Sequence, residues 1–360
     1  MITGHGGNIF DLARRQGCGP SAITDMSSNV NPIGSLPGIK TYLAERLPVI
    51  ESLPEADAGT ITGLFAGYQG VGPENVVSGN GSTQLLYAVP RALGTRKALI
   101  LGPAYADYDS ACRQQGVTPD WLLSTGKNGF KPDLDRLESL AGQYDTIFIC
   151  NPNNPTGAMV PHSDLATIFA SRPETVFIVD ESYLPFAEKA EQPPRFYGGL
   201  PNVIRLTSLS KIFKIPGLRI GFVVAKAERI TEIRKFAMPW SVNSLACEAV
   251  AWILENGDRA GRFIRETKKF LAIERTAIEV FFKESPHIRW FPSCTSFILA
   301  RLNRAHTATA VCDALAERRI LIRNCSNFEG LSEKFIRVSL KSHAENRRFS
   351  KTLSEILEAF

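Results

Sequence analysis

The chain has 360 residues and a mass of 39.6 kDa, which is enough for one large and one small domain. Apolar residues make up 44% of it and charged residues 21%, which excludes a disordered chain, and no apolar run is long enough to predict a membrane-spanning helix. The 41 basic and 36 acidic residues leave a net charge of +5, and the basic residues form no long block. The sequence therefore argues against nucleic-acid binding and leaves anionic small molecules as ligands.

The cysteines, the histidines and the N-terminus indicate the class of protein. The seven cysteines form no CxxC pair, and an odd, dispersed set is typical of a reducing cytosol. No histidine stands at metal-ligand spacing from another histidine or cysteine, so we expect no metal site. The N-terminal residues lack a basic start followed by an apolar stretch, so we expect no signal peptide and a cytoplasmic protein.

The chain alternates strand-like and helix-like segments up to about residue 240. Residues 1–45 contain glycine and proline without clear periodicity and predict an arm that packs over a site. The segments 107–115 and 163–170 between the strands suit helices. This alternation predicts an α/β fold with a mainly parallel sheet covered on both faces. The expected strands are short, apolar and bounded by turn residues, and they occupy 97–104, 146–151, 175–181, 202–208 and 220–225.

The pattern changes after residue 240. Residues 243–283 predict long helices, and the remainder predicts a smaller α+β unit. Its expected strands lie within 288–302, 320–325 and 335–340, and its helices lie near 308–318 and 345–359. We therefore expect an arm and part of a small domain in 1–45, a large domain in 46–240, and linking helices with the rest of the small domain in 241–360.

Lys211 stands in the sequence SLSK (208–211), directly after an expected buried strand, and Arg219 follows eight residues later. Most lysines are simply solvated, but a lysine with hydroxyls and an arginine nearby suits an aldehyde cofactor that carries a phosphate. The amine would form an imine with the aldehyde, and the other groups would hold the anion.

Two further polar segments follow expected strands. Asp180 and Tyr183 lie in DESY (180–183), where the acid would cap the next helix or pair with a protonated pyridine nitrogen. Asn154 lies in NPNNPTG (151–157), which is an ordinary turn or a loop that presents an amide to the cofactor's ring oxygen. Because the carboxyl ends of parallel strands face one crevice, both segments are candidates for one site.

Two more segments have a structural and a functional interpretation. SGNGST (78–83) precedes a helical run, so it is a plain strand–helix turn or a phosphate cradle at a helix N-terminus. Tyr105 and Tyr108, in GPAYADY (102–108), either pack in the core or stack on a flat ring.

In this order and spacing, NPNNPTG, DESY and SLSK with PGLRIG (216–221) resemble the fold-type I pyridoxal phosphate enzymes, specifically class I/II aminotransferases of the histidinol-phosphate aminotransferase type. The resemblance covers nearly the whole chain. It implies a large domain with a mainly parallel seven-stranded sheet, a smaller α+β domain, pyridoxal 5'-phosphate as the cofactor, and a homodimer with sites at the interface.

The resemblance also implies roles for residues. Lys211 would bind the cofactor covalently, Asp180 would hold its ring nitrogen, Asn154 and Tyr183 would contact its ring oxygen, and Tyr105 would stack on the ring. The residues expected around its phosphate are Gly81, Ser82, Thr83, Ser208, Ser210 and Arg219.

Both ends of the chain add a finer resemblance. HGGN (5–8), SNVNPIG (28–34), MPWSVN (238–243) and RRILIR (318–323) are similar to the L-threonine-O-3-phosphate decarboxylases of cobalamin biosynthesis. That family makes (R)-1-amino-2-propanol phosphate from a small phosphorylated amino acid. The substrate-binding residues that it implies are His5, Gly6, Asn31, Asn154, Arg323 and Arg337.

The sequence departs from the family near residue 53. The family usually has a tyrosine there that reaches the cofactor phosphate of the neighbouring subunit, whereas this chain has Leu53. That contact would be missing or supplied by another residue such as Tyr68. GNGS (79–82) also replaces the GNGE often found in the decarboxylases, which matters little because the donors there are backbone groups.

The leading hypothesis is a decarboxylase of L-threonine O-3-phosphate. Its alternatives are a histidinol-phosphate-type aminotransferase, a decarboxylase that prefers L-serine O-phosphate, and a non-catalytic protein that kept the fold. One methyl group in a pocket is worth only about 1–3 kcal/mol, so the sequence leaves the choice between threonine and serine phosphate open. It also leaves open which arginine binds which anion and which group returns a proton to Cα; Lys211 is one candidate.

Overall fold

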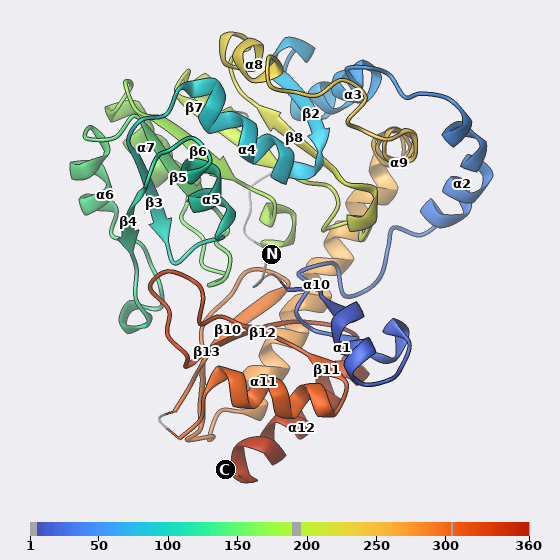
Figure 1. Ribbon diagram of the computed structural model, residues 1–360, viewed down its shortest axis with the longest axis vertical. Helices are drawn as coiled ribbons and strands as arrows, with labels where there is room; N and C mark the ends of the chain where they lie inside the picture. The colour runs from blue at the N-terminus through green and yellow to red at the C-terminus, as the bar shows by residue number, and fades with distance from the viewer. Residues whose placement is uncertain (1–5, 189–195, 304, 360) are drawn as a thin grey trace.

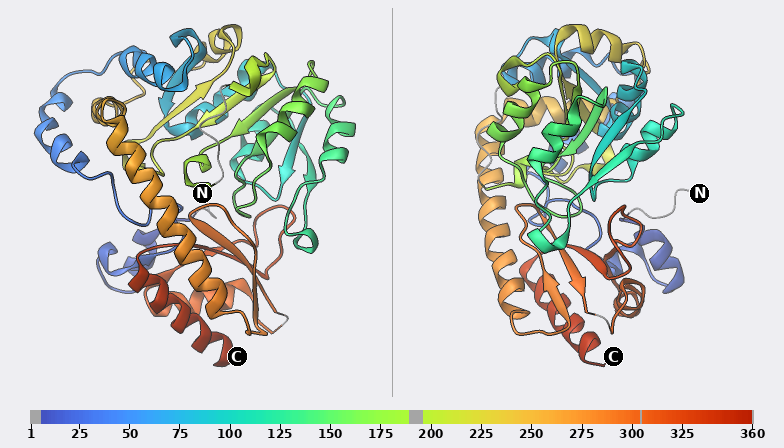
Figure 2. Two further views of the ribbon diagram at one scale, coloured as in Figure 1. Left: turned by 180° about the vertical axis from the view of Figure 1, so that it is seen from behind. Right: turned by 90° about the vertical axis from the view of Figure 1, so that its left-hand side faces the viewer.

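The computed structural model describes residues 6–188, 196–303 and 305–359, which form two units (Figure 1). The upper unit holds a seven-stranded sheet, and the lower unit holds a four-stranded sheet. Helix α10 (Gly257–Phe281) runs along the back of the molecule from one unit to the other (Figure 2).

The large sheet has the strand order β2-β8-β7-β6-β5-β3-β4. Only β8 runs against the others, because its pairings with β2 and β7 are antiparallel and the remaining pairings are parallel. The five strands predicted from the sequence are confirmed, whereas β2 and β4 were not predicted. The strands are β2 (Val76–Asn80), β3 (Ala98–Gly102), β4 (Asp120–Leu123), β5 (Thr146–Cys150), β6 (Val176–Asp180), β7 (Val203–Thr207) and β8 (Ile220–Val224).

Helices cover the large sheet because its inner strands bury both faces. In β5, Phe148 packs with residues of α4 and α5, whereas Ile147 and Ile149 pack with residues of α6 and α7. Alternate side chains of a strand point to opposite faces, so a continuous apolar run needs a helical layer on each side. The helices of these layers are α4 (Gly81–Leu93), α5 (Asp107–Arg113) and α8 (Ala227–Arg234) on one face, and α6 (Leu134–Ala141) and α7 (His162–Ser171) on the other.

Helices α3 and α9 complete the large unit. Phe65 of α3 stacks on Phe222 of β8, with the ring centroids 3.9 Å apart. Helix α3 spans Gly59–Gln69, and helix α9, against which it packs, spans Ser244–Glu255.

The smaller unit is an antiparallel sheet in the order β12-β13-β10-β9 with helices against it. The predicted segment 320–325 divides into two short strands, because Ile320 and Leu321 pair with the N-terminal strand β1 and Arg323 and Asn324 pair with β13. Its elements are β9 (Ile288–Trp290), β10 (Phe297–Leu302), α11 (Ala308–Glu317), β11 (Ile320–Leu321), β12 (Arg323–Asn324), β13 (Phe335–Ser339) and α12 (His343–Ala359).

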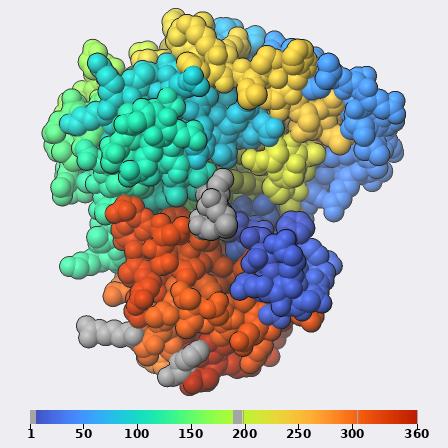
Figure 3. Space-filling model, viewed as in Figure 1, coloured from blue at the N-terminus to red at the C-terminus, as the bar shows by residue number. Residues whose placement is uncertain are grey.

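Residues 6–45 divide between the two units. Helix α1 (Ile9–Arg15) and strand β1 (Thr24–Asp25) lie against the smaller unit, and α2 (Ile39–Glu45) packs on α9 of the larger one (Figures 1 and 3). The loop between β1 and α2 therefore runs past the junction of the units. None of the described helices has both the length and the apolar composition that a membrane span needs.

Candidate active site

A cavity of about 240 Å³ lies where the carboxyl ends of β5, β6 and β7 meet the start of α4. This is the edge of a parallel sheet at which ligands bind in open α/β folds. All the residues that the sequence predicted around the cofactor line this cavity. They are Gly81, Ser82, Thr83, Tyr105, Asn154, Asp180, Tyr183, Ser208, Ser210, Lys211 and Arg219.

Two glycines bring the start of α4 close to Arg219. Gly81 has φ +76°, and a Cβ built on it would lie 2.5 Å from Nη2 of Arg219. A Cβ on Gly221 would lie 2.2 Å from the backbone nitrogen of Ser82. The first N–H groups of a helix have no partner within the helix, so these N–H groups and the guanidinium together suit an anion such as a phosphate.

Lys211 extends into the cavity over Tyr183. Its Nζ lies 4.1 Å from the centre of the Tyr183 ring. Burial by itself lowers the pKa of Lys211, but Tyr183 and Asp180 outweigh it, and the pKa is raised. A negative group opposite the amine therefore holds it as a cation.

Asp180 ends β6 with its carboxylate held from two sides. Oδ1 accepts a hydrogen bond from the backbone nitrogen of Ser182 at 2.9 Å, and Oδ2 accepts one from the hydroxyl of Tyr108 at 2.8 Å. The first bond closes a turn within the loop after β6. It is not the helix cap that one interpretation of the sequence gave, because the short helix that follows (Leu184–Phe186) has Tyr183 as its N-cap residue and no side-chain cap. Asp180 lines the cavity instead.

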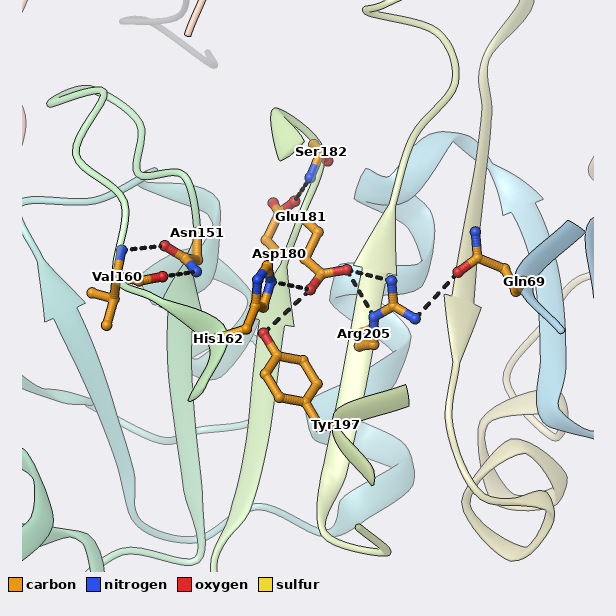
Figure 4. A network of polar contacts seen from close by, with 9 residues as sticks. All are labelled: Gln69, Asn151, Val160, His162, Asp180, Glu181, Ser182, Tyr197 and Arg205. Carbon is orange, nitrogen blue, oxygen red and sulfur yellow. Dashed lines mark hydrogen bonds and ion pairs between the residues drawn. The ribbon is translucent and has the colours of Figure 1, made fainter. Parts of the chain in front are cut away.

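The next residue, Glu181, faces away from the cavity into a buried polar network (Figure 4). Its Oε2 accepts from Nε and Nη2 of Arg205 at 2.7 and 2.6 Å, and its Oε1 lies 3.2 Å from Nε2 of His162 and from the Tyr197 hydroxyl. Burial raises the pKa of Glu181, but Arg205 and His162 outweigh it, and the net shift is downward. The ion pair joins β6 to β7 directly behind Asp180.

The loop after β5 is closed by Asn151, as Figure 4 also shows. Its side chain donates to the carbonyl of Val160 at 2.9 Å and accepts from the Val160 nitrogen at 2.8 Å. Asn153 donates to the carbonyl of Pro103 at 2.8 Å. These bonds fold the loop back on the sheet and leave Asn154 at the cavity wall.

A second cavity of about 240 Å³ adjoins the first and shares Tyr105, Asn154, Tyr183 and Lys211 with it. It lies between the large sheet and the smaller unit. Of the predicted substrate residues, Gly6, Asn154, Arg323 and Arg337 line it. His5 lies outside the described residues.

Arg323 and Arg337 stand opposite each other on β12 and β13, so their side chains leave the same face of the small sheet. Arg337 is buried and donates to Oδ1 of Asn154 and to the carbonyl of Ser27, the latter at 2.8 Å. Its Nε has no hydrogen-bond partner among the described residues. Arg323 donates to Oδ1 of Asn327 at 2.7 Å.

No carboxylate of the described chain forms an ion pair with either arginine. Burial lowers the pKa of both guanidiniums, and the charge of Arg337 lowers that of Arg323 further. Two cations without an anionic partner make this cavity suitable for a ligand with negative groups.

The N-terminal loop contributes groups that the sequence did not assign. Asn29 donates to the hydroxyl of Tyr183 at 3.1 Å and accepts from Ser339 at 2.6 Å. Ser27 accepts from the backbone nitrogen of Gly7 at 2.7 Å, which holds the start of the described chain at the cavity. Asn29 and Tyr183 are 154 positions apart, and no spacing or motif links them.

Asn31 corrects one expectation. Its side chain is buried beneath the loop, where it donates to the carbonyl of Ile212 at 2.7 Å and to the hydroxyl of Thr267 at 2.8 Å, and accepts from the nitrogen of Ile33. Its amide is committed to these bonds, so Asn31 holds the N-terminal loop to the lysine loop and to α10 and does not extend into the substrate cavity.

Residues 62–353 match the family described as aminotransferase class I and II. The chain belongs to this family. The family and its fold were both predicted from the sequence and are confirmed, and with them pyridoxal phosphate as the cofactor.

Two relatives and one solved structure place this member of the class I and II family more closely. The threonine-phosphate decarboxylase of Salmonella typhimurium strain LT2 is 31% identical, with 99% of this chain and 97% of that protein covered. A histidinol-phosphate aminotransferase of Methanococcus maripaludis strain C5 is 25% identical, covering 97% and 94%. The crystal structure of L-threonine-O-3-phosphate decarboxylase from Porphyromonas gingivalis has 31% identity and a TM-score of 0.81, covering 93% of this chain and 100% of that one.

The first cavity fits pyridoxal phosphate by its donor set. A lysine amine, a carboxylate at a strand end and an anion cradle surround one space, and the glycines at 81 and 221 leave the cradle open to close approach. An aldehyde, a basic ring nitrogen and a phosphate need those three partners in that arrangement.

Proposed function

We propose that this chain decarboxylates L-threonine O-3-phosphate, giving (R)-1-amino-2-propanol O-2-phosphate and CO₂, for the linker of the cobalamin nucleotide loop. The observation that carries the proposal is the pair Arg323 and Arg337, which lines a cavity shared with Lys211. A phosphorylated amino acid carries two anionic groups, and two cations beside the reactive lysine match them. The higher identity to the decarboxylase, 31% against 25%, favours it over the aminotransferase.

Each of the proposed cofactor residues suits a different part of pyridoxal phosphate. When bound, pyridoxal phosphate supplies an electron sink for a breaking bond at Cα of the substrate. Lys211 would bind the aldehyde carbon, Asp180 would pair with the ring nitrogen, and Asn154 and Tyr183 would contact the ring oxygen. Tyr105 would stack on the ring, and the N-terminus of α4, Ser208, Ser210 and Arg219 would hold the phosphate.

The two arginines decide which bond breaks. Only the Cα bond that stands perpendicular to the cofactor ring is activated, so a decarboxylase must hold its substrate's carboxylate in that position. Anchors on both anionic groups fix the rotation about Cα, whereas a single anchor leaves it free. Because Lys211 also lines the substrate cavity, its amine is the candidate acid that would return a proton to Cα after CO₂ has left.

We also propose a homodimer. Leu53 is 79% exposed, and the apolar side chains of Leu47, Ile50, Met238 and Trp240 are exposed as well. The two segments that carry them are adjacent, because the nitrogen of Trp240 donates to the carbonyl of Ala56 at 2.9 Å. Exposed apolar groups gathered in this way are typical of a subunit interface.

Two expectations stay predictions of the sequence. Leu53 has no hydroxyl, so it could not make the family's contact with the cofactor phosphate of a neighbouring subunit. Tyr68, which is 52% exposed, is still a candidate for this contact. The cytoplasmic location likewise rests on the sequence alone, on the cysteine pattern and on the composition of the first residues.

Product analysis tests the proposed function. The protein loaded with pyridoxal phosphate is mixed with L-threonine O-3-phosphate without any keto acid, and we expect catalytic formation of aminopropanol phosphate by mass spectrometry. L-Serine O-phosphate in the same assay measures the preference between the two substrates. Formation of glutamate from histidinol phosphate with 2-oxoglutarate, in the absence of decarboxylation, would instead identify an aminotransferase.

A further inference from the structure

Tyr108 is buried beside the cofactor cavity with its hydroxyl on Asp180. The side chain is 1% exposed, and its ring stacks on Phe148 at a centroid distance of 5.6 Å and an interplanar angle of 24°. The edge of Tyr105 meets it at 5.8 Å. The ring is therefore wedged in place, and its hydroxyl donates to Oδ2 of Asp180 at 2.8 Å.

The phenol stays protonated and so remains a donor. Burial, Asp180 and Cys150 all raise the pKa of Tyr108 well above its ordinary value of 10.0. The neighbouring Cys150 is neutral too, because burial and then Asp180 raise the pKa of its thiol to about 12. Among the described residues, the ionisable groups on which the charge of Asp180 acts include Tyr105, Tyr108, Cys150 and Lys211, and of these four Lys211 is the one that carries a charge.

We infer that Tyr108 is a positioning residue that holds the carboxylate of Asp180 in one orientation and withdraws part of its negative charge. This inference rests on the proposed function, because it concerns the group that would face the ring nitrogen of the cofactor. Ser182 occupies Oδ1 from within the same turn, and Tyr108 is the donor that reaches Oδ2 from another element, α5. Without it, the carboxylate keeps only the bond from Ser182, is less firmly oriented and carries more of its charge.

The charge on Asp180 affects Lys211, whose cationic form it favours. A phenol that donates to a carboxylate oxygen spreads the charge over the hydrogen bond, and a carboxylate without that donor attracts a neighbouring cation more strongly. Loss of the Tyr108 hydroxyl should therefore favour the protonated nitrogen at Lys211. The loaded enzyme reports that protonation by the absorbance of its bound cofactor.

The experiment compares Tyr108→Phe with Tyr197→Phe. Both variants lose one buried hydroxyl that donates to a carboxylate, but Tyr197 donates to Glu181, which faces away from the cavity. In Tyr108→Phe we expect the pH midpoint of the cofactor absorbance change to rise by about one unit, and the affinity for pyridoxal phosphate to fall by about tenfold. In Tyr197→Phe both quantities should equal those of the wild type.

A second measurement covers the case in which Tyr108→Phe does not fold. Replacement of Tyr108 by 3-fluorotyrosine keeps the shape and makes the phenol a stronger donor, so the midpoint should move down. A double-mutant cycle with Asp180→Asn should abolish the effect of Tyr108→Phe, since the amide carries no charge to share.

Two results separate the inference from the proposed function. A wild-type protein that acquires no cofactor absorbance overturns the proposed function. A wild type with a measurable midpoint, which neither Tyr108→Phe nor the fluorinated residue moves, overturns the role of Tyr108 alone.

Discussion

The cofactor cavity and the substrate cavity share a wall but are built in different ways. The first draws its side chains from residues 81–219 of the large unit. Most of these groups follow a parallel strand or begin a helix, and Arg219 directly precedes the antiparallel strand β8. The second adds groups from both ends of the chain, among them Gly6, Ser27, Arg323 and Arg337. The residues proposed to bind the cofactor therefore come mainly from strand ends of one sheet. The residues proposed to select the substrate come from the junction of the two units.

The difference follows from what each cavity has to do. A cofactor common to a family suits groups that a rigid parallel sheet presents in a fixed order. A substrate is better bound by side chains that can be substituted without disturbing that sheet. The N-terminal loop and the β12–β13 pair carry such side chains. Variants in the two cavities should accordingly give different phenotypes.

The largest effect is expected at Lys211, which lines both cavities. Lys211→Ala removes both the proposed covalent link to the cofactor and the amine proposed to move a proton, and turnover should fall by about 10⁴-fold. The measurement is aminopropanol phosphate formed over time, together with the absorbance of bound cofactor. The matched control is Lys214→Asn, because Lys214 is exposed in the same loop. This variant should keep both the turnover and the cofactor absorbance of the wild type. Persistent turnover in Lys211→Ala would remove this residue from the chemistry.

Glu181 shows whether the wall behind the cofactor cavity is held by charge. Glu181→Gln leaves Arg205 buried without a counter-ion and should reduce the free energy of unfolding by about 3–5 kcal/mol. Chemical denaturation measures the change, with the exposed Glu279→Gln as the control.

The pH dependence of the same variant has a definite sign. The pKa of Glu181 in the folded protein lies below its ordinary value of 4.5, so its contribution to stability is present above pH 4.5 and is lost as the pH falls through the folded-state pKa. The stability difference between wild type and Glu181→Gln should therefore shrink in acid. A difference that grows as the pH falls would contradict the ion pair.

A variant of Arg337 tests whether the substrate cavity can be changed without affecting cofactor binding. Lysine keeps the charge but cannot reach Asn154 and the Ser27 carbonyl together, so Arg337→Lys should lower kcat/KM by about a hundredfold. The absorbance of bound cofactor should not change, because the proposed cofactor contacts remain. Arg301→Lys on the exposed side of β10 is the control. Loss of cofactor from Arg337→Lys would show that the two cavities are not independent.

Arg323 should give the smallest effect of the four. It is less buried than Arg337, and it donates a hydrogen bond to the side chain of Asn327. Arg323→Lys should raise KM about tenfold, the cost of one weakened charge-assisted bond, and leave kcat nearly unchanged. Steady-state kinetics with L-threonine O-3-phosphate measures it. An unchanged KM would leave Arg337 as the anchor for both anions.

The strand-end residues could be predicted because local sequence determines them. Asp180, Asn154 and Lys211 each follow an apolar run, and a parallel sheet brings such positions to one edge whatever the rest of the chain does. The two strands that escaped prediction have weaker patterns: β4 is a half-exposed edge strand, and β2 passes directly into the glycines at 79 and 81.

Asn31 and Asn29 show where prediction from sequence ended. They are two positions apart in one loop, yet Asn29 reaches Tyr183 in the cavity and Asn31 reaches Thr267 on α10. Both pairs join residues more than 150 positions apart. Which asparagine faces the cavity depends on how the loop crosses the junction, and no periodicity encodes that crossing.

The motif resemblance predicted the family and the cofactor, and the apolar runs predicted a mainly parallel sheet, because motifs and runs are local features of the sequence. The residues that the sequence predicted around the cofactor line one cavity. No local feature predicted that Arg323 and Arg337 leave one face side by side, that Glu181 turns away from the site while Asp180 faces it, or that Tyr108 donates to Asp180. Those outcomes depend on strand register and on packing between distant segments, where one residue of displacement reverses the direction of a side chain.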